Sequence, residues 1–224
     1  MDKKARHEHK MYINISDYMG LTSKLKHIAR PDSNSTDDGG YKVRSLYFDN
    51  YSDKAVVEKL SGVNRREKFR IRLYNDDSSF IRLEKKSKLN RLCYKESTTL
   101  TKEQCEMLLN GDYNVLKDEQ KLLSVELYTK MHYQNLRPRT IVDYKREAYV
   151  YPIGNVRITF DKNIRTSNNI YGFFNPELVT IPATNAIILE IKYDGFVPEI
   201  IRQILRMDSR NETEFSKYVV SRLV

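Results

Sequence analysis

The sequence predicts an α+β fold in which an antiparallel β-barrel forms a tunnel with helices around it. Many segments alternate charged and apolar side chains with a period of two, which is typical of strands with two different faces. Only a few helices separate these segments, and strict strand–helix alternation is absent, which favours an antiparallel sheet. With 224 residues and 40% hydrophobic side chains, we expect one domain that spans residues 1–224.

The first half of the chain is predicted to hold two helices and a meander of strands. Ser16 is a good N-cap for a helix over residues 17–29, and Gly62 closes a short helix over residues 53–60. A loop rich in Asp, Ser, Asn and Gly, residues 30–40, is expected at the surface. Strands are expected at residues 9–15, 42–49, 68–74, 80–86 and 92–98, with a turn at residues 75–78.

The second half is predicted to mix helices with long strands. Thr101 and Gln104 have capping-box spacing ahead of a helix over residues 102–109. Pro138 is expected to stop a longer helix over residues 115–135. The remaining strands are expected at residues 139–150, 156–162 and 187–193, and the last two helices at residues 198–207 and 212–223.

The charge of the chain points to an anionic partner. Lys and Arg number 39 against 30 Asp and Glu, a formal charge of +9, although this sign does not distinguish nucleic acid, anionic lipid and phosphate. Cys93 and Cys105 lack the spacing of a zinc or redox motif. No apolar run approaches the roughly 18 residues of a membrane span. We therefore expect a cytoplasmic protein with reduced thiols.

Charged residues gather on one face of several predicted strands. Arg70 and Arg72 flank Ile71, and Glu190 and Lys192 repeat this spacing. In an ordinary sandwich such a face is solvated, which is one interpretation. In a closed barrel whose apolar faces pack outward against helices, the charged faces line the interior instead. Repulsion among the enclosed cations then requires an anion.

A triphosphate or polyphosphate suits such an interior. It carries several charges in a line, Arg offers forked donors to phosphate oxygens, and Lys adds point charges. Glutamates among these cations are candidate ligands for Mg²⁺ or Mn²⁺, which bridges phosphate oxygens. The chain has no nucleophile-elbow motif and no P-loop motif.

Eight short motifs follow one another along nearly the whole chain. They are RHEHK at residues 6–10, RSLYFD at 44–49, KFRIRLY at 68–74, LEKK at 83–86, YKR at 144–146, VRITFD at 156–161, LEIKY at 189–193 and FSKY at 215–218. In this order they resemble the VTC (vacuolar transporter chaperone) domain, which belongs to the triphosphate tunnel metalloenzymes. The resemblance implies a polymerase that moves the γ-phosphoryl group of ATP onto a growing polyphosphate chain, with a divalent metal that is usually manganese.

The resemblance also implies roles for individual residues. Matching positions suggest that phosphates are held by Lys10, Arg70, Arg72, Lys86, Arg146 and Arg157, oriented by Tyr144, and contacted from the last helix by Ser216 and Lys217. Glu190 is the implied metal ligand. The strand faces add Arg44 and Lys192 as phosphate ligands and Glu84 as a second metal ligand. Expected partners are ATP and polyphosphate or pyrophosphate, and a membrane protein by resemblance, but no nucleic acid.

Other functions remain open at the level of the sequence. A triphosphatase would use the same tunnel with water as the acceptor. The family has a lysine just before the FSK run, where this chain has Glu214, and this departure keeps open a noncatalytic polyphosphate-binding module. Alternatively, Asn211 and Glu214 form a capping box at the start of the last helix. A nucleic-acid binder would need its basic strand faces exposed and interleaved with aromatic residues.

Overall fold

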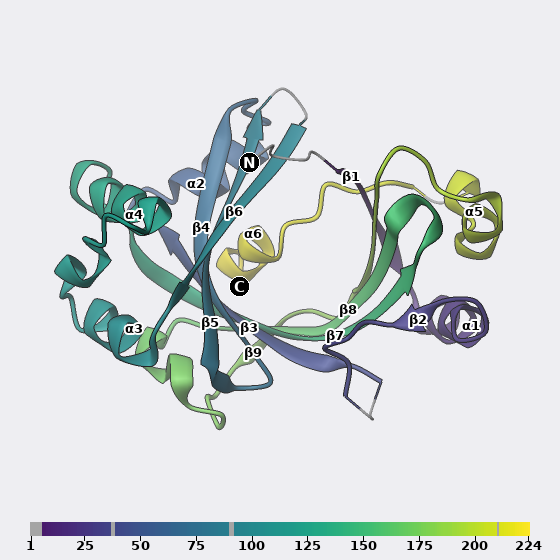
Figure 1. Ribbon diagram of the computed structural model, residues 1–224, viewed down its shortest axis with the longest axis horizontal. Coiled ribbons are helices and arrows are strands. Elements are labelled where there is room, and N and C mark those ends of the chain that lie inside the picture. Colours follow the sequence, from purple (N-terminus) through teal and green to yellow (C-terminus); the bar gives the residue numbers. More distant parts are fainter. Residues whose placement is uncertain (1–5, 37–38, 90–91, 210) are drawn as a thin grey trace.

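A computed structural model of the protein describes residues 6–36, 39–89, 92–209 and 211–224. Its centre is one antiparallel sheet that curls around an open interior (Figure 1). In chain order the strands are β1 (His7–Ile13), β2 (Arg30–Pro31), β3 (Tyr41–Asp49), β4 (Arg66–Tyr74), β5 (Asp77–Leu89), β6 (Leu92–Leu100), β7 (Arg137–Tyr151), β8 (Val156–Ser167), β9 (Ile181–Thr184) and β10 (Ile187–Tyr193).

The order of the strands makes the sheet a half-barrel. The main path runs β1-β10-β8-β7-β3-β4-β5-β6, while β2 pairs with β7 and β9 pairs with β8. All of these pairs are antiparallel. Within the described residues no ladder joins β1 to β6, so the curled sheet is open along this side. The predicted α+β fold built on an antiparallel tunnel-type sheet is confirmed in this form.

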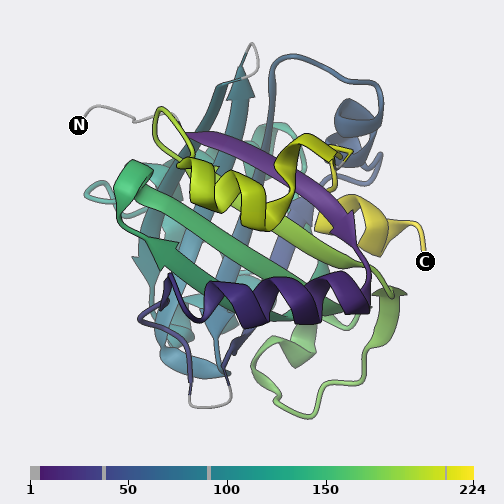
Figure 2. The ribbon, with the colours of Figure 1, turned by 90° about the vertical axis from the view of Figure 1, so that its right-hand side faces the viewer.

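Helices cover both outer flanks of the sheet, and one lies inside the curl. The α-helices are α1 (Ile15–Leu25), α2 (Lys54–Leu60), α3 (Lys102–Leu109), α4 (Leu122–Tyr133), α5 (Glu199–Leu205) and α6 (Lys217–Arg222). In Figure 1, α3 and α4 lie outside β4–β6, and α6 lies on the concave side. Figure 2 shows α1 and α5 over the opposite flank. None of the helices in the described part of the chain is long and apolar enough to cross a membrane.

The outer face of β4 and β5 forms the first apolar core. Ile71 and Leu83 point outward and pack with Leu108 of α3 and with Leu127 and Met131 of α4. All five side chains are fully buried. Because side chains alternate across a strand, the neighbours of Ile71 and Leu83 must point to the concave side.

The opposite flank is built in the same way. Ile158 of β8 and Leu189 of β10 pack with Leu25 of α1 and with Ile201 and Leu205 of α5. Burying such side chains stabilises each by about 1.5–3 kcal/mol relative to exposure. The apolar faces of the strands are thus strongly favoured to point outward. Because side chains alternate across a strand, the charged faces then point inward.

Helix α6 fills one end of the concave side. Its Tyr218 and Val219 are buried with Tyr47 of β3 and with Val142 and Tyr144 of β7. The Tyr218 hydroxyl donates a hydrogen bond of 2.8 Å to the buried carboxylate of Asp49. The rest of the interior is left to polar side chains.

Several predicted element boundaries are wrong for local reasons. Helix α1 begins at Ile15 because Asn14 is its N-cap, with its side chain accepting from the Asp17 amide at 2.7 Å; Ser16 lies inside the helix. The capping box of Thr101 and Gln104 is confirmed. Strand β10 has its predicted bounds, whereas β8 runs five residues beyond its predicted end at residue 162.

The helix expected over residues 115–135 is interrupted. A 3₁₀ helix, η1 (Tyr113–Leu116), precedes a turn in which the Asp118 carboxylate accepts from the Gln120 amide at 3.1 Å. Such a side-chain bond competes with the helical pattern. Pro138 does not stop α4, which ends at Tyr133; it lies near the start of β7 instead.

The last helix is shorter than predicted. Ser216 caps α6, which begins at Lys217, and Glu214 lies in the irregular segment before it. The capping-box interpretation of Asn211 and Glu214 is therefore wrong. The sequence patterns also missed two short strands: β2, whose pairing partner β7 is distant in sequence, and β9, which pairs with the preceding strand β8.

Candidate phosphate-binding site

A cavity of about 380 Å³ lies on the concave side of the sheet. Twelve of the thirteen predicted site residues line it, and Arg44 does not. Among the described residues its walls carry twelve Lys and Arg against three Glu. The cations are Arg6, Lys10, Lys68, Arg70, Arg72, Lys85, Lys86, Lys95, Arg146, Arg157, Lys192 and Lys217, and the glutamates are Glu8, Glu84 and Glu190.

Cross-strand register places the arginines of β4 beside their partners. Arg70 is opposite Glu84 on β5 and Tyr47 on β3. Its Nε donates to Glu84 Oε2 at 2.8 Å, and its Nη1 donates to the Tyr47 hydroxyl at 3.1 Å. Arg72 donates to the Tyr144 hydroxyl at 3.1 Å. Both guanidinium groups are thus oriented by the sheet before any ligand binds.

Glu84 acts as the anchor of this wall. One carboxylate oxygen contacts Arg70 and Arg72, and the other contacts Lys95 Nζ at 2.5 Å. Burial opposes ionisation, but these three cations hold the pKa of Glu84 far below its usual value. Both oxygens are therefore committed to protein cations, and the prediction of Glu84 as a metal ligand is not supported by this geometry. Its position suits the orientation of the arginines.

A second anchor lies across the cavity, where β7, β8 and α6 meet. Asp161 is fully buried and accepts from Arg146 at 2.6 and 2.8 Å, in a bidentate pair that their register sets. Lys217 also bonds to Asp161. The Tyr144 ring lies 4.7 Å from Lys217 Nζ and 5.3 Å from the Arg146 guanidinium. Asp161 and Tyr144 therefore hold two cations toward the interior.

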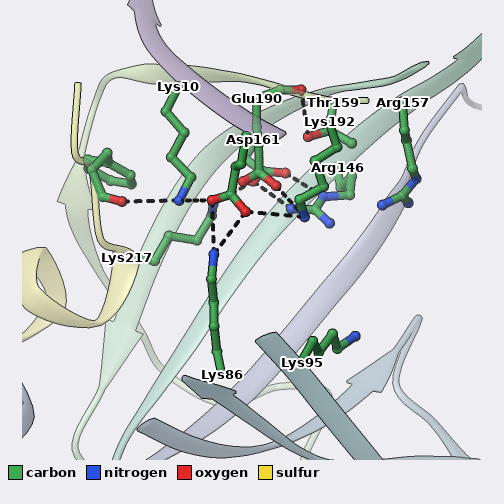
Figure 3. Close-up of polar contacts among 12 residues, drawn as sticks. Lys10, Lys86, Lys95, Arg146, Arg157, Thr159, Asp161, Glu190, Lys192 and Lys217 are labelled. Atoms are coloured by element: carbon green, nitrogen blue, oxygen red, sulfur yellow. Dashed lines mark hydrogen bonds and ion pairs between the residues drawn. The ribbon is translucent and has the colours of Figure 1, made fainter. Parts of the chain in front are cut away.

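Lysines from β1, β5 and β10 converge around Glu8 and Glu190. Figure 3 shows Lys10, Lys86, Lys192 and Glu190. Lys86 Nζ lies 2.9 Å from both Glu8 oxygens, and Lys10 Nζ lies 2.6 Å from Oε1. Lys192 pairs with Glu190 at 2.5 Å. Burial and the charge of Glu190 raise the pKa of Glu8, but the lysines outweigh them and lower it to about 2.

Arg157 occupies the β2 side of the cavity. Its Nε donates to Asp32 at 3.0 Å and its Nη2 to the Tyr41 hydroxyl at 2.9 Å. A quarter of its side chain stays exposed. The guanidinium of Arg157 is thus oriented by Asp32 and Tyr41, and its exposed part can still contact a ligand.

Lys68 and Tyr47 form a pair that the sequence reasoning did not nominate. Lys68 Nζ donates to the Ser216 hydroxyl at 3.3 Å and lies 5.9 Å from the centre of the Tyr47 ring. Burial lowers the pKa of Lys68 to about 7. Burial alone would raise the pKa of Tyr47, but the neighbouring cations, Arg70 first, lower it to about 7.

This pair predicts proton uptake when a polyanion binds. An added anion favours the charged form of Lys68 and disfavours the Tyr47 phenolate, so it raises both pKa values above about 7. Between the free and bound pKa values, affinity must fall as pH rises; below pH 7 both groups are already protonated and affinity levels off. Titration calorimetry with tripolyphosphate near pH 8, in buffers of different ionisation enthalpy, measures this uptake.

The matched variants are Lys68→Met and Tyr47→Phe. Each is expected to lower the number of protons taken up on binding, because each removes one titrating group. Proton uptake that is unchanged in both variants would show that other groups, including the phosphate itself, account for the pH dependence.

Arg44 is the site residue that the sequence analysis placed wrongly. It points to the outer face of β3, is 1% exposed, and pairs with Asp143 at 2.8 Å. Its Nη1 also donates to the carbonyl oxygens of Phe173 and Asn175, at 3.2 and 2.5 Å. The cavity side of β3 carries Tyr41 and Tyr47 instead. Arg44 fastens the η3 segment (Ile170–Phe174) to the sheet.

We expect Arg44→Met to lower the free energy of unfolding by about 3 kcal/mol, because it removes the hydrogen-bonded partner of the buried Asp143 carboxylate and leaves it with Lys42, at 3.8 Å. Replacing both residues, Arg44→Met with Asp143→Leu, is expected to recover part of this loss. Chemical denaturation measures both effects. Tripolyphosphate affinity of the folded single variant should stay within about twofold; a much larger loss would put Arg44 back in the binding site.

The carboxylates that line the cavity fit a divalent cation only if substrate phosphates complete its coordination. Among the described residues no group of three or more His, Cys, Asp or Glu forms a ready-made metal cage. Mg²⁺ in phosphate sites commonly takes only one or two carboxylates plus substrate phosphates. Glu190, which is 6% exposed and lines the cavity, meets that requirement, with Glu8 as its carboxylate neighbour.

The signals for the missed residues were present in the strand faces. Lys68 lies two positions before Arg70, and Asp161 lies four positions after Arg157 on the same face of β8. Lys95 gave no such signal, because its strand mixes charged and polar residues on both faces.

A curled antiparallel sheet around a cavity with a large surplus of Lys and Arg defines a protein of the tunnel type with a cationic interior. The chain belongs to the VTC domain family, whose model matches residues 5–224. The resemblance drawn from the motifs is confirmed.

Solved structures show the same fold. A Bacillus halodurans protein named as a candidate adenylate cyclase is 14% identical, with a TM-score of 0.59 over 96% of each chain. A Hippeastrum protein named as a candidate adenylyl cyclase with a dominant triphosphatase activity is 15% identical, with a TM-score of 0.55 over 98% of this chain and 96% of that one. At such identities the likeness establishes the fold alone. A comparison with curated protein sequences gives no match.

Proposed function

We propose that this protein is a metal-dependent polyphosphate polymerase that transfers the γ-phosphoryl group of ATP to a growing polyphosphate chain within the cavity. The observation that carries the proposal is the surplus of cations that line a cavity of about 380 Å³, twelve against three glutamates. Membership of the VTC domain family supports it. A cytoplasmic location, where ATP is plentiful, accords with this function.

The chemistry asks the protein mainly for alignment and charge stabilisation. The attacking terminal phosphate is already ionised, so a general base is not needed. Arg70, Arg72 and Arg146 present forked donors whose directions are fixed by Glu84 and Asp161. Such preorganised cations stabilise the charge that develops on the transferred group.

Lysines would complete the binding of the chain. Lys10, Lys86 and Lys192 come from three strands and surround the two glutamates near the open side of the sheet. Ser216 and Lys217 reach the same cavity from the start of α6. Glu190 would hold a Mg²⁺ or Mn²⁺ ion, which would supply neutralisation of the phosphate charge. That carboxylate is kept ionised by its cationic neighbours, Lys192 first, which outweigh the opposing effect of burial and lower its pKa well below the usual value.

Hydrolysis of triphosphate is the second candidate. The Hippeastrum protein with a similar fold is named for a triphosphatase activity, and the same cavity would serve water as an acceptor. Transfer to a phosphate chain gives synthesis, whereas transfer to water gives hydrolysis. Which of the two occurs depends on how well the cavity excludes water from the γ-phosphate.

The deciding experiment is incubation of the purified protein with ATP and Mn²⁺ or Mg²⁺, followed by measurement of polyphosphate, ADP and orthophosphate. Synthesis predicts polyphosphate with ADP. Orthophosphate without chains would replace the proposal by hydrolysis. Tight binding of polyphosphate without turnover would instead indicate a noncatalytic binding module. Glu214, which stands where the family has a lysine, is the feature of the sequence that suggests this alternative.

A further inference from the structure

A second cavity, of about 690 Å³, adjoins the first. The two share wall residues that include Lys10, Lys68 and Lys86, so an elongated ligand can extend from one into the other. The outer part of the second cavity is lined by Lys59 of α2, Arg66 of β4 and other cations. It lies beyond the residues assigned to the reacting phosphates.

Three cations in this second cavity meet at a single carboxylate. Glu214 contacts Lys59, lies 3.3 Å from Lys88 Nζ and lies 3.6 Å from Arg66 Nη2. The hydrogen bond from Lys59 is the main cause that lowers the pKa of Glu214 to about 2. Since one carboxylate carries one charge, the cluster keeps a positive surplus.

The segment that carries Glu214 is held against the edge of the sheet. The Thr213 amide donates to the Lys10 carbonyl at 2.7 Å, and Glu212 lies 2.9 Å from His9 Nδ1. The Glu214 side chain itself remains 67% exposed. Figure 1 shows the connection between α5 and α6 crossing above the interior. Glu214 therefore reaches the three cations from a fixed backbone, through an exposed side chain that can move away.

We propose that the second cavity is an additional polyphosphate-binding site for the part of the chain beyond the reacting phosphates, and that Glu214 competes with that chain for Lys59, Arg66 and Lys88. The identity of the ligand rests on the proposed function. Displacing Glu214 costs little, because exposed ion pairs contribute little to stability. A linear polyanion replaces its single charge with several.

Ligands of different length distinguish binding in the first cavity from binding in the second. Tripolyphosphate is short enough for the first cavity alone, whereas a long chain can extend into the second. The double variant Lys59→Gln, Lys88→Gln is therefore expected to weaken the binding of long-chain polyphosphate by about fivefold, and that of tripolyphosphate by less than about twofold. Glu214→Gln is expected to strengthen the binding of the long chain alone, by about threefold.

Calorimetry without divalent metal, at ~0.1 M salt, measures both affinities. The matched control is Lys24→Gln, Lys26→Gln, which removes the same charge from two exposed lysines at the C-terminal end of α1. Equal changes for both ligands, or the same long-chain loss in the control, would overturn the second site. These binding measurements need no turnover, so an absence of chain growth from ATP would sink the proposed function while leaving the length dependence as a separate result.

Discussion

Replacing Arg70 by alanine is expected to lower kcat/KM for polyphosphate synthesis by about 10²–10³-fold, the loss typical of removing one preorganised donor to a developing charge. Arg70 lies in the interior with its guanidinium fixed between Glu84 and Tyr47. Alanine removes the charge and both forked donors together. Arg70→Lys keeps the charge but loses the fork, so we expect it to recover only part of the activity.

The control for this variant is Arg82→Ala. Arg82 lies on the neighbouring strand, bonds to Ser97 and does not line the cavity. Its replacement should leave kcat/KM within about twofold, because its side chain bonds to Ser97 and is absent from the cavity wall, although Arg82 is the cross-strand neighbour of Arg72. Circular dichroism and thermal unfolding check that Arg70→Ala stays folded, because it also removes a partner of the buried Glu84. Full activity in folded Arg70→Ala would refute the assignment of the cavity as the reaction site.

Glu190→Gln is expected to change turnover and binding in opposite directions. Chain growth from ATP should fall by about 10²–10³-fold, because the cavity loses the carboxylate that would hold the metal. Without metal, however, removal of a negative charge near Lys192, Lys10 and Arg146 makes the cavity more positive and releases Lys192 from its ion pair with Glu190. Tripolyphosphate affinity in the absence of metal should rise by about tenfold.

Parallel assays of turnover against Mn²⁺ concentration and of metal-free binding measure the two effects. Glu126→Gln is the matched control: its carboxylate pairs with Lys85 on the α4 side of the sheet. We expect that variant to change neither quantity by more than about twofold. If Glu190→Gln weakened metal-free binding, Glu190 would have a structural role in holding its lysines in place.

The strand faces were the part of the site that the sequence could predict. Arg70, Arg72, Glu190 and Lys192 were assigned to one face from their spacing alone, and all four line the cavity. The prediction holds because the alternating apolar residues must be buried against helices. The large free energy of this burial decides which face of each strand points outward and which points to the cavity. Arg44 is an exception, because this charged side chain points to the outer face of its strand. There the Asp143 carboxylate and the carbonyl oxygens of Phe173 and Asn175 accept its hydrogen bonds in place of water.

Local boundaries were less predictable, because competing signals have similar strengths. Asn14 and Ser16 are both good N-caps, and Asn14 wins where β1 ends. Asn211 and Glu214 match a capping box, yet Ser216 caps the helix and Glu214 joins a cluster of cations instead. These choices differ by about 1 kcal/mol, which tertiary contacts easily exceed.

The sequence by itself determined that this protein has an antiparallel sheet with one apolar and one charged face. Only the tertiary structure decided which cations converge, which carboxylates hold them, and that a second basic cavity continues from the first. The reason is that alternation is a property of neighbouring residues, whereas the Asp161–Arg146–Lys217 and Lys59–Glu214–Lys88 clusters join segments far apart in the chain. Their contacts exist only once the sheet has curled.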